Sequence, residues 1–168
     1  VTRHDRAAPH GSGSVKAGGN YACSFWPGAE AKAKGFAEAL YLDPVEHRYI
    51  DEIGAANFLG FRDRTLITPD SMSVLPSITR ESLLQIASEL FGWPTERRKI
   101  PLEELDEISA AACCGTAAVI TWIRQIADGD RTWEFPFDER WQRLYDELVG
   151  IQTATAADPF GWRHKIPV

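Results

Sequence analysis

The sequence has few of the features that mark membrane, secreted or nucleic-acid-binding proteins. No stretch of its 168 residues approaches the roughly 20 consecutive apolar residues that a membrane-spanning helix needs. No signal-peptide pattern opens the chain. Basic residues are in the minority, since 18 Lys and Arg face 24 Asp and Glu, for a net charge of −6. This balance argues against a nucleic-acid or anionic-membrane partner.

Cysteine and histidine are also scarce. The three cysteines, Cys23, Cys113 and Cys114, are odd in number and two of them are adjacent. This argues against a disulfide scaffold and favours a reducing compartment, so we expect a cytoplasmic or mitochondrial protein. There is no CxxC, and the four histidines are scattered. We therefore expect no metal site, because the ligand spacings of metal sites are missing.

The length and composition fit one globular domain that occupies residues 1–168. Hydrophobic residues make up 44% of the chain and charged residues 25%, as in ordinary soluble proteins. The chain begins at Val1, and its only methionine is Met72. We therefore expect a fragment, a processed product or the ordered part of a longer protein.

Short strand patterns alternate with amphipathic helix patterns along the chain, which predicts an α+β or mixed α/β domain. Strands are predicted at 38–42, 48–53, 57–62, 65–67, 95–100 and 132–137, and an apolar run at 108–126 breaks at Gly115-Thr116. Helices are predicted at 21–35, 79–91, 101–105 and 138–150.

Individual residues refine these boundaries. Asp63-Arg64 is typical of a hairpin turn. Pro27 predicts a kink or a lost hydrogen bond in its helix. Asp138 is a candidate N-cap of the last helix, and Gly150 is its expected end.

Several segments, taken together, resemble one known family. They are RAAP at 6–9, VKAGGNY at 15–21, AEAKAKG at 29–35, LDPVEHRYIDEIG at 42–54, LPSITR at 75–80, GTAA at 115–118, and GIQ at 150–152 with DPFGW at 158–162. In this order and spacing they resemble the branched-chain amino-acid aminotransferases, which have the class IV fold of pyridoxal-phosphate enzymes. The resemblance implies the C-terminal, cofactor-binding domain, a strongly curved mixed β-sheet or pseudo-barrel flanked by helices. Family members are about twice as long, so their N-terminal domain is expected to be absent from this chain.

The resemblance gives Lys16 the central chemical role. In the family, the lysine of this KAGGNY motif carries pyridoxal 5′-phosphate as a Schiff base, the internal aldimine, and later moves the substrate proton. Such a lysine must be partly desolvated, so that some of its amine is unprotonated. The resemblance also implies that Tyr21 hydrogen-bonds the phenolic oxygen of the cofactor. The alternative is that Lys16 is a solvated surface lysine and Tyr21 a core tyrosine at a helix start.

Glu52 is the second candidate. The resemblance implies that its carboxylate pairs with the pyridine nitrogen and keeps it protonated. If 48–53 is a strand, Asp51 and Glu52 point to opposite faces. We therefore expect one carboxylate to face the cofactor and the other to face solvent; the alternative is that both are exposed strand-end charges.

The remaining candidates would bind anionic groups. Ile78 and Thr79 open a helix, whose free N–H groups form a ready phosphate site. Thr79 could also be a simple N-cap. Ser77 stands where the family usually has glycine, so it either adds a donor or disturbs the turn. The resemblance implies that Thr116 contacts the cofactor phosphate, and Thr116 with Ala117 the substrate carboxylate.

The resulting hypothesis is a pyridoxal-phosphate-dependent transaminase. It would pass the amino group of Leu, Ile or Val to 2-oxoglutarate or another 2-oxo acid, and it would be a homodimer. One alternative is a half-enzyme or pseudo-aminotransferase that acts as a binding or assembly partner. A D-amino-acid aminotransferase or an aminodeoxychorismate lyase, both from the same fold class, is the other.

Overall fold

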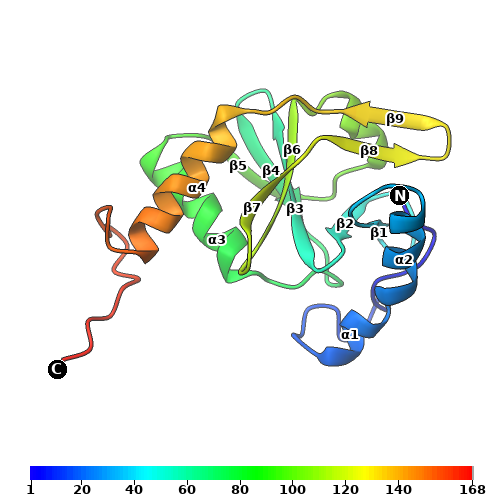
Figure 1. Cartoon of the computed structure of the whole chain (residues 1–168), viewed down its shortest axis with the longest axis horizontal. Helices are drawn as coiled ribbons and strands as arrows, with labels where there is room; N and C mark the ends of the chain where they lie inside the picture. Colours follow the sequence, from blue (N-terminus) through cyan, green and yellow to red (C-terminus); the bar gives the residue numbers. More distant parts are fainter. Residues whose placement is uncertain (168) are drawn as a thin grey trace.

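A β-sheet with helices on either side of it makes up most of the chain (Figure 1), and the computed structural model describes residues 1–167. The helices are α1 (Gly18–Ala22), α2 (Phe25–Ala33), α3 (Ile78–Gln85) with a π-helical continuation η1 (Ile86–Leu90), the 3-10 turn η2 (Leu102–Asp106) and α4 (Glu139–Gln152). The strands are β1 (Leu40–Leu42), β2 (Ile50–Ile53), β3 (Ala56–Arg62), β4 (Thr65–Pro69), β5 (Thr95–Arg98), β6 (Ala110–Gly115), β7 (Val119–Ile123), β8 (Gln125–Asp128) and β9 (Arg131–Glu134). Within this described part, every helix is too short or too polar to cross a bilayer.

Strand β3 is the centre of the sheet because it pairs with three others. Its first residues pair with β2, its last residues pair with β4, and β6 runs antiparallel along its opposite edge. β1 extends the sheet beyond β2, β5 lies parallel to β4, and β7 pairs with β6. β8 and β9 form a separate two-stranded hairpin. This mixed sheet with flanking helices confirms the predicted fold class.

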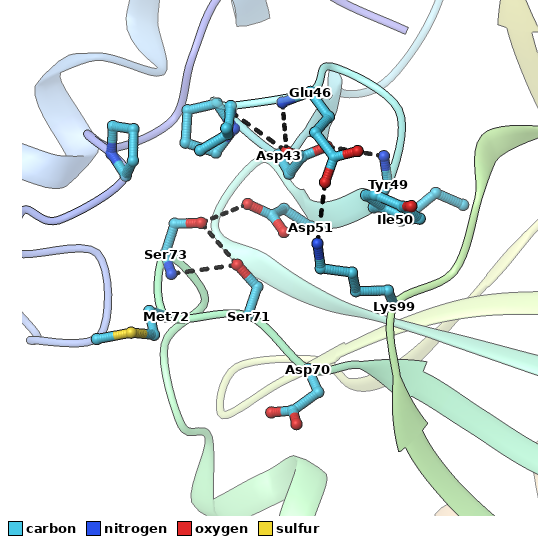
Figure 2. Close-up of a pocket in the computed structure, with 13 residues that line it drawn as sticks. Asp43, Glu46, Tyr49, Ile50, Asp51, Asp70, Ser71, Met72, Ser73 and Lys99 are labelled. Atoms are coloured by element: carbon cyan, nitrogen blue, oxygen red, sulfur yellow. Dashed lines mark hydrogen bonds and ion pairs between the residues drawn. The ribbon is translucent and has the colours of Figure 1, made fainter.

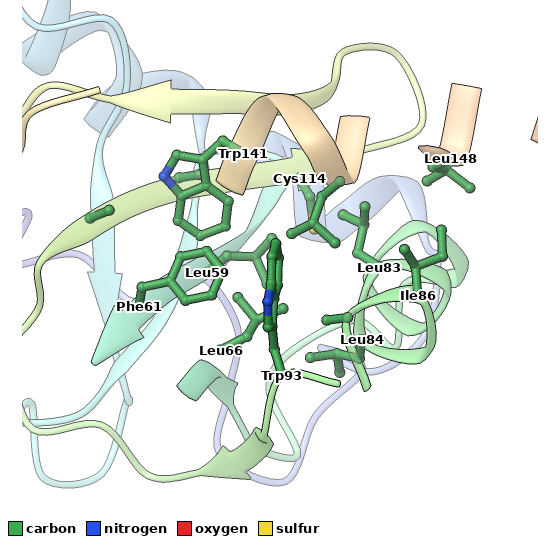
Figure 3. Packing of buried hydrophobic residues seen from close by; sticks show 14 of the residues in the cluster. Leu59, Phe61, Leu66, Leu83, Leu84, Ile86, Trp93, Cys114, Trp141 and Leu148 are labelled. Atoms are coloured by element: carbon green, nitrogen blue, oxygen red, sulfur yellow. The ribbon is translucent and has the colours of Figure 1, made fainter. Parts of the chain in front are cut away.

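The sheet separates two hydrophobic cores, because alternate residues of a strand point to opposite faces. On one face, Leu59 and Phe61 of β3 pack with side chains of α3 and α4, including Leu83 and Trp141 (Figure 3). On the other face, Phe58 packs with residues of β1, β2, η2 and the β8–β9 hairpin. The pairing of β3 with β2 and β6 fixes these three strands relative to one another.

Most predicted elements are present, with ends that differ by a few residues. The predicted strands correspond to β1 to β5 and β9, and the apolar run divides into β6 and β7 at the predicted break. The turn at Asp63-Arg64 is confirmed, with Asp63 in the left-handed region at φ 53°. Asp138 is confirmed as an N-cap, since its Oδ1 accepts the Arg140 N–H at 2.9 Å. The helix predicted at 79–91 begins at Ile78 and becomes π-helical from Ile86.

The single helix predicted at 21–35 is wrong. The chain forms α1 and α2 instead, with a break at Cys23 and Ser24. Proline has no N–H, so a continuous helix would leave a carbonyl unpaired one turn before Pro27. Because α2 restarts at Phe25, Pro27 lies in its first turn, where no N–H is needed.

Gly150 does not end the last helix, contrary to the prediction. α4 continues to Gln152, with Thr153 as its C-cap. A Cβ on Gly150 would lie 2.9 Å from the Cβ of Ala156, and the Gly150 carbonyl accepts N–H groups from Thr155 and Ala156. Glycine is therefore needed here for the close return of the chain over the helix, and not for a left-handed cap.

Substitution of Trp141 tests how much the core between the sheet and helices α3 and α4 contributes to stability. Its side chain is 2% exposed and its ring centroid lies 4.6 Å from that of Phe61. Trp141→Ala should lower the free energy of unfolding by about 3–5 kcal/mol, through lost burial and a residual cavity. Urea denaturation measures this loss. Trp26→Ala is the matched control, because Trp26 is 68% exposed, and should change stability by about 0.5 kcal/mol or less. Equal losses in the two variants would contradict the packing described.

Candidate active site

Glu52 lies at the centre of the candidate site and is almost completely buried, with 1% of its surface exposed. One carboxylate oxygen, Oε1, accepts the Leu75 backbone N–H at 2.7 Å and the Asn57 side-chain amide at 3.2 Å. The other oxygen, Oε2, forms an ion pair with Nε of Arg6, which is also buried. Three separate segments of the chain therefore hold this carboxyl group in one orientation.

Burial is the main influence on the charge of Glu52. It raises the pKa of this carboxyl to about 7, while the positive charge of Arg6 and the Leu75 N–H act in the opposite direction. The negative charge of Asp51 adds to the increase, and Arg80 opposes it more weakly. Near neutral pH, Glu52 can therefore change its protonation state in response to a group bound beside it.

The expectation for Asp51 was wrong, because neither carboxylate of β2 faces solvent. Asp51 is 2% exposed, and its Oδ2 accepts the Ser73 hydroxyl at 2.6 Å. The chain that follows β4 covers this face of the strand. Burial raises the pKa of Asp51, although hydrogen bonds from Ser73 and Ser71 oppose the increase.

The sheet register brings Thr116 to the same region as Glu52. Glu52 on β2 lies opposite Asn57 on β3, and Asn57 lies opposite Cys114 on β6. The turn that follows β6 carries Thr116 and Ala117, whose side chains are exposed. Thr116 and Ala117 therefore lie just beyond the end of β6, and Cys114 near that end is in register with Asn57 and, through it, with Glu52.

The start of α3 is joined to Glu52 through Leu75. Ile78 and Thr79 are the first two helical residues, and Ile78 is 82% exposed. Within residues 1–167, the backbone N–H groups of Ile78 and Thr79 have no hydrogen-bond acceptor. Ser77 is the N-cap, because its hydroxyl oxygen accepts the Arg80 N–H at 3.3 Å. The alternative of Thr79 as the cap was wrong, and the serine stabilises the turn.

Lys16 and Tyr21, which the resemblance assigns to the same cofactor, lie together in the structure. The Lys16 amine and the Tyr21 hydroxyl are 3.0 Å apart. Asn20 holds the intervening loop closed, since its side-chain amide donates to the carbonyls of Ser12 and Val15 at 2.7 and 2.8 Å. Lys16 is exposed, so the described residues do not supply the expected desolvation.

The Lys16 loop is anchored next to the segment that contacts Glu52. A Cβ on Gly13 would lie 2.3 Å from the Ser73 carbonyl oxygen, so only glycine permits this close approach. Ser73 is two residues from Leu75, whose N–H binds Glu52. The structure thus links the lysine loop, the buried carboxylate and the start of α3 through the segment at 73–75.

Sequence reasoning assigned no role to Arg6, Asn57 or the Leu75 N–H. Arg6 lies within a segment that the resemblance included, but it directly follows Arg3, His4 and Asp5. That context gives no signal for a buried cation, and its partner, Glu52, is distant in the sequence. Asn57 and Leu75 carry no local signal, because their contacts to Glu52 depend on strand register and on the path of a loop.

A cavity of about 410 Å³ lies next to Asp51 and Ser73, and Figure 2 shows its lining. Asp51, Ser73 and Lys99 line it, whereas Lys16 and Glu52 do not. The Ser73 hydroxyl bonded to Asp51 lies on its wall (Figure 2). The cavity is therefore separate from the predicted site residues. No group of three or more metal-ligating side chains occurs in the part of the chain that the structure describes.

Known proteins resemble this chain in both sequence and structure. A sequence model described as amino-transferase class IV matches residues 1–126. The branched-chain-amino-acid aminotransferase of Haemophilus influenzae is 45% identical over 99% of this chain and 51% of its own length. For the enzyme of the same name from Helicobacter pylori, identity is 44% over 99% of this chain and 49% of that protein. This chain therefore spans about half the length of these curated relatives.

Solved structures agree with the sequence matches. The branched-chain amino acid aminotransferase from Escherichia coli superposes with a TM-score of 0.84 at 34% identity, over 96% of this chain and 54% of that one. A second branched-chain amino acid aminotransferase, solved in complex with N-(5′-phosphopyridoxyl)-L-glutamate, gives a TM-score of 0.83 at 26% identity, over 96% of this chain and 54% of that one.

The buried Glu52 carboxyl predicts how stability depends on pH. Its folded pKa of about 7 lies above the ordinary 4.5, so between these values the folded chain holds a proton that the unfolded chain has lost. The free energy of unfolding should therefore fall as pH rises from about 5 to about 8, by up to about 3 kcal/mol from this group. Asp51, whose pKa is also raised, adds to the fall.

Urea denaturation at several pH values measures this dependence. Glu52→Gln cannot titrate, so its stability should fall less steeply with pH than that of the unaltered chain. Glu89→Gln is the control, because Glu89 is exposed and should leave the slope unchanged. If Glu52→Gln retains the full slope, the charge state assigned to Glu52 is wrong.

Proposed function

The chain belongs to the amino-transferase class IV family, and we propose that it is the cofactor-binding half of a branched-chain amino-acid aminotransferase that uses pyridoxal 5′-phosphate. The observation that carries this proposal is the arrangement of Glu52, buried and held by three segments, beside the anchored Lys16–Tyr21 loop. The names of the relatives support the amino-acid class, and one of the similar structures was solved with a phosphopyridoxyl ligand.

The donors and acceptors present fit this cofactor. Glu52 offers Oε2 as an acceptor for a protonated ring nitrogen, and the neighbouring Arg6 favours the ionised carboxylate against the effect of burial. Ile78 and Thr79 offer two backbone N–H groups at a helix start, where phosphate binds favourably. Thr116 adds a hydroxyl from the neighbouring turn. Lys16 offers an exposed amine that is within hydrogen-bond distance of Tyr21.

Lys16 is proposed to hold the cofactor and to transfer the proton. Its amine would attach covalently to the cofactor, and after release it would take the proton from the substrate α-carbon and deliver it to the C4′ position of the cofactor. Tyr21 would orient that amine and donate a hydrogen bond to the phenolic oxygen of the cofactor. When bound, pyridoxal phosphate supplies an electron sink for the electron pair left at the α-carbon.

Glu52 would keep the ring nitrogen protonated, which makes that electron sink effective. The start of α3 and Thr116 would bind the phosphate and so fix the position of the ring. Thr116 and Ala117 would also contact the substrate carboxylate through the exposed turn after β6. Each of these residues would therefore bind or orient, and only Lys16 would carry a proton between reacting atoms.

The proposed substrates are Leu, Ile or Val with 2-oxoglutarate or another 2-oxo acid. The support is that the relatives named above are branched-chain enzymes. Nothing specific favours the D-amino-acid or lyase alternatives.

We propose that the rest of the site comes from a second domain or a partner chain, in a homodimeric assembly. Two observations support this. This chain spans about half of its relatives, and Lys16, the residue that most needs desolvation, is exposed. A further domain over Lys16 would exclude water from the amine and would add contacts to the phosphate and the substrate.

Cofactor attachment tests the proposed role of Lys16. Adding pyridoxal phosphate to the protein should give a yellow absorbance band, and borohydride reduction should fix the cofactor to the peptide that contains Lys16, as identified by mass spectrometry. Lys16→Ala should lose both signals. Lys32→Ala should keep both, because Lys32 lies on α2 and belongs to no contact of the site.

Cofactor fixed to Lys32, or no cofactor fixed to the protein, would contradict the cofactor proposal.

The activity to measure is amino-group transfer from Leu, Ile or Val to 2-oxoglutarate. Cofactor attachment without any transfer, even when the protein is supplied with the remaining half of the site, would instead favour a pseudo-aminotransferase.

A further inference from the structure

Arg6 is a buried cation that contacts the functional carboxylate directly. It lies ten residues before Lys16 in the sequence, and 5% of its surface is exposed. Its Nε forms an ion pair with Oε2 of Glu52, and its Nη1 lies 3.5 Å from the Ser73 carbonyl oxygen. The planar guanidinium thus spans β2 and the segment that leads to α3.

The hydrogen bonds of Glu52 are unevenly divided between its two oxygens. Oε1 accepts from both Leu75 and Asn57, which uses its two lone pairs. Oε2 contacts Arg6, which leaves one acceptor position on that oxygen. A ring nitrogen would therefore share Oε2 with Arg6.

Other charged groups surround this pair. Asp51 points to the opposite face of β2, where Ser73 hydrogen-bonds it, and burial raises the pKa of its carboxyl. Arg80 of α3 acts on Glu52 through space, but its guanidinium donates to the Pro69 carbonyl and contacts Glu81. Within residues 1–167, Arg6 is the one residue that forms an ion pair with Glu52.

Cys114 of β6 and Tyr41 of β1 are further titratable groups near the Arg6–Glu52 pair. Burial raises the pKa of the Cys114 thiol and that of the Tyr41 hydroxyl to about 12, so both stay neutral near pH 7 and cannot compensate a charge. Arg6 therefore provides the direct counter-charge for Glu52.

We propose that Arg6 is a positioning residue that keeps Glu52 ionised and holds its Oε2 in place for the ring nitrogen of the cofactor. This inference rests on the proposed function. Burial alone favours the protonated acid, and a protonated Glu52 could not stabilise a protonated ring nitrogen. Lysine would keep the charge but would lose one of the two contacts, since it lacks the planar guanidinium.

Cofactor binding distinguishes this role from a purely structural one. The probes are pyridoxal 5′-phosphate and its deaza analogue, in which CH replaces the ring nitrogen. Arg6→Gln should weaken binding of pyridoxal phosphate about tenfold or more, which corresponds to one unit of pKa change or more at Glu52. Binding of the deaza analogue should change by less than about twofold, because it has no ring nitrogen to pair with Glu52.

The control and rescue variants sharpen this comparison. Arg3→Gln removes one positive charge from the same segment at an exposed position, and it should leave both affinities unchanged. Arg6→Lys should recover part of the affinity for pyridoxal phosphate. Equal losses for both probes in Arg6→Gln, or no loss for either, would overturn the inference.

A measurement on the unaltered, cofactor-free protein covers the case in which Arg6→Gln fails to fold. The NMR resonance of the Arg6 Nε–H group should shift with pH at the same midpoint as the Glu52 carboxyl carbon. An Arg6 resonance that does not follow Glu52 would overturn the inference without any cofactor. If the two resonances titrate together but neither probe binds the unaltered protein, the proposed function fails while the Arg6–Glu52 coupling stands.

Discussion

A carboxylate in a protein interior is strongly unfavourable unless hydrogen-bond donors and a counter-charge surround it. Glu52 meets this requirement with contributions from distant parts of the chain: Arg6 from the N-terminal segment, Asn57 from β3 and the Leu75 N–H from the segment before α3. Satisfying one buried group therefore fixes where the N-terminal segment and the start of α3 lie relative to the sheet. The proposed cofactor contacts depend on these same segments.

The sheet supplies the frame for this arrangement. β3 pairs with three strands, so Glu52 of β2 and Cys114 of β6 lie on either side of Asn57. Separate cores pack on the two faces and make the strands rigid. Lys16, in contrast, lies in an exposed loop that is held by Asn20 and by the close fit of Gly13 against Ser73. The contacts proposed for the ring nitrogen thus lie within this chain, whereas the Lys16 side of the candidate site is open to solvent.

Local interactions explain what the sequence predicted well. Asp138 as a cap and the turn at Asp63 both involve residues close in sequence, and both are confirmed. Two of the errors arose where the chain folds back onto an element that it has already formed. The chain at 155–156 packs against Gly150, and the segment with Ser73 covers Asp51, neither of which a local pattern reveals. The pairing of Arg6 with Glu52 was missed for the same reason. The roles of the site residues toward a cofactor stay predictions.

The central claim is that one cofactor bridges the Lys16 loop and the buried Glu52 carboxylate. A crystal structure of the protein with pyridoxal 5′-phosphate bound tests it most directly. We predict continuous electron density between the cofactor and the Lys16 amine, the ring nitrogen within hydrogen-bond distance of Glu52 Oε2, and the phosphate at the N–H groups of Ile78 and Thr79. A cofactor attached to another lysine, or one whose ring nitrogen lies away from Glu52, would contradict it.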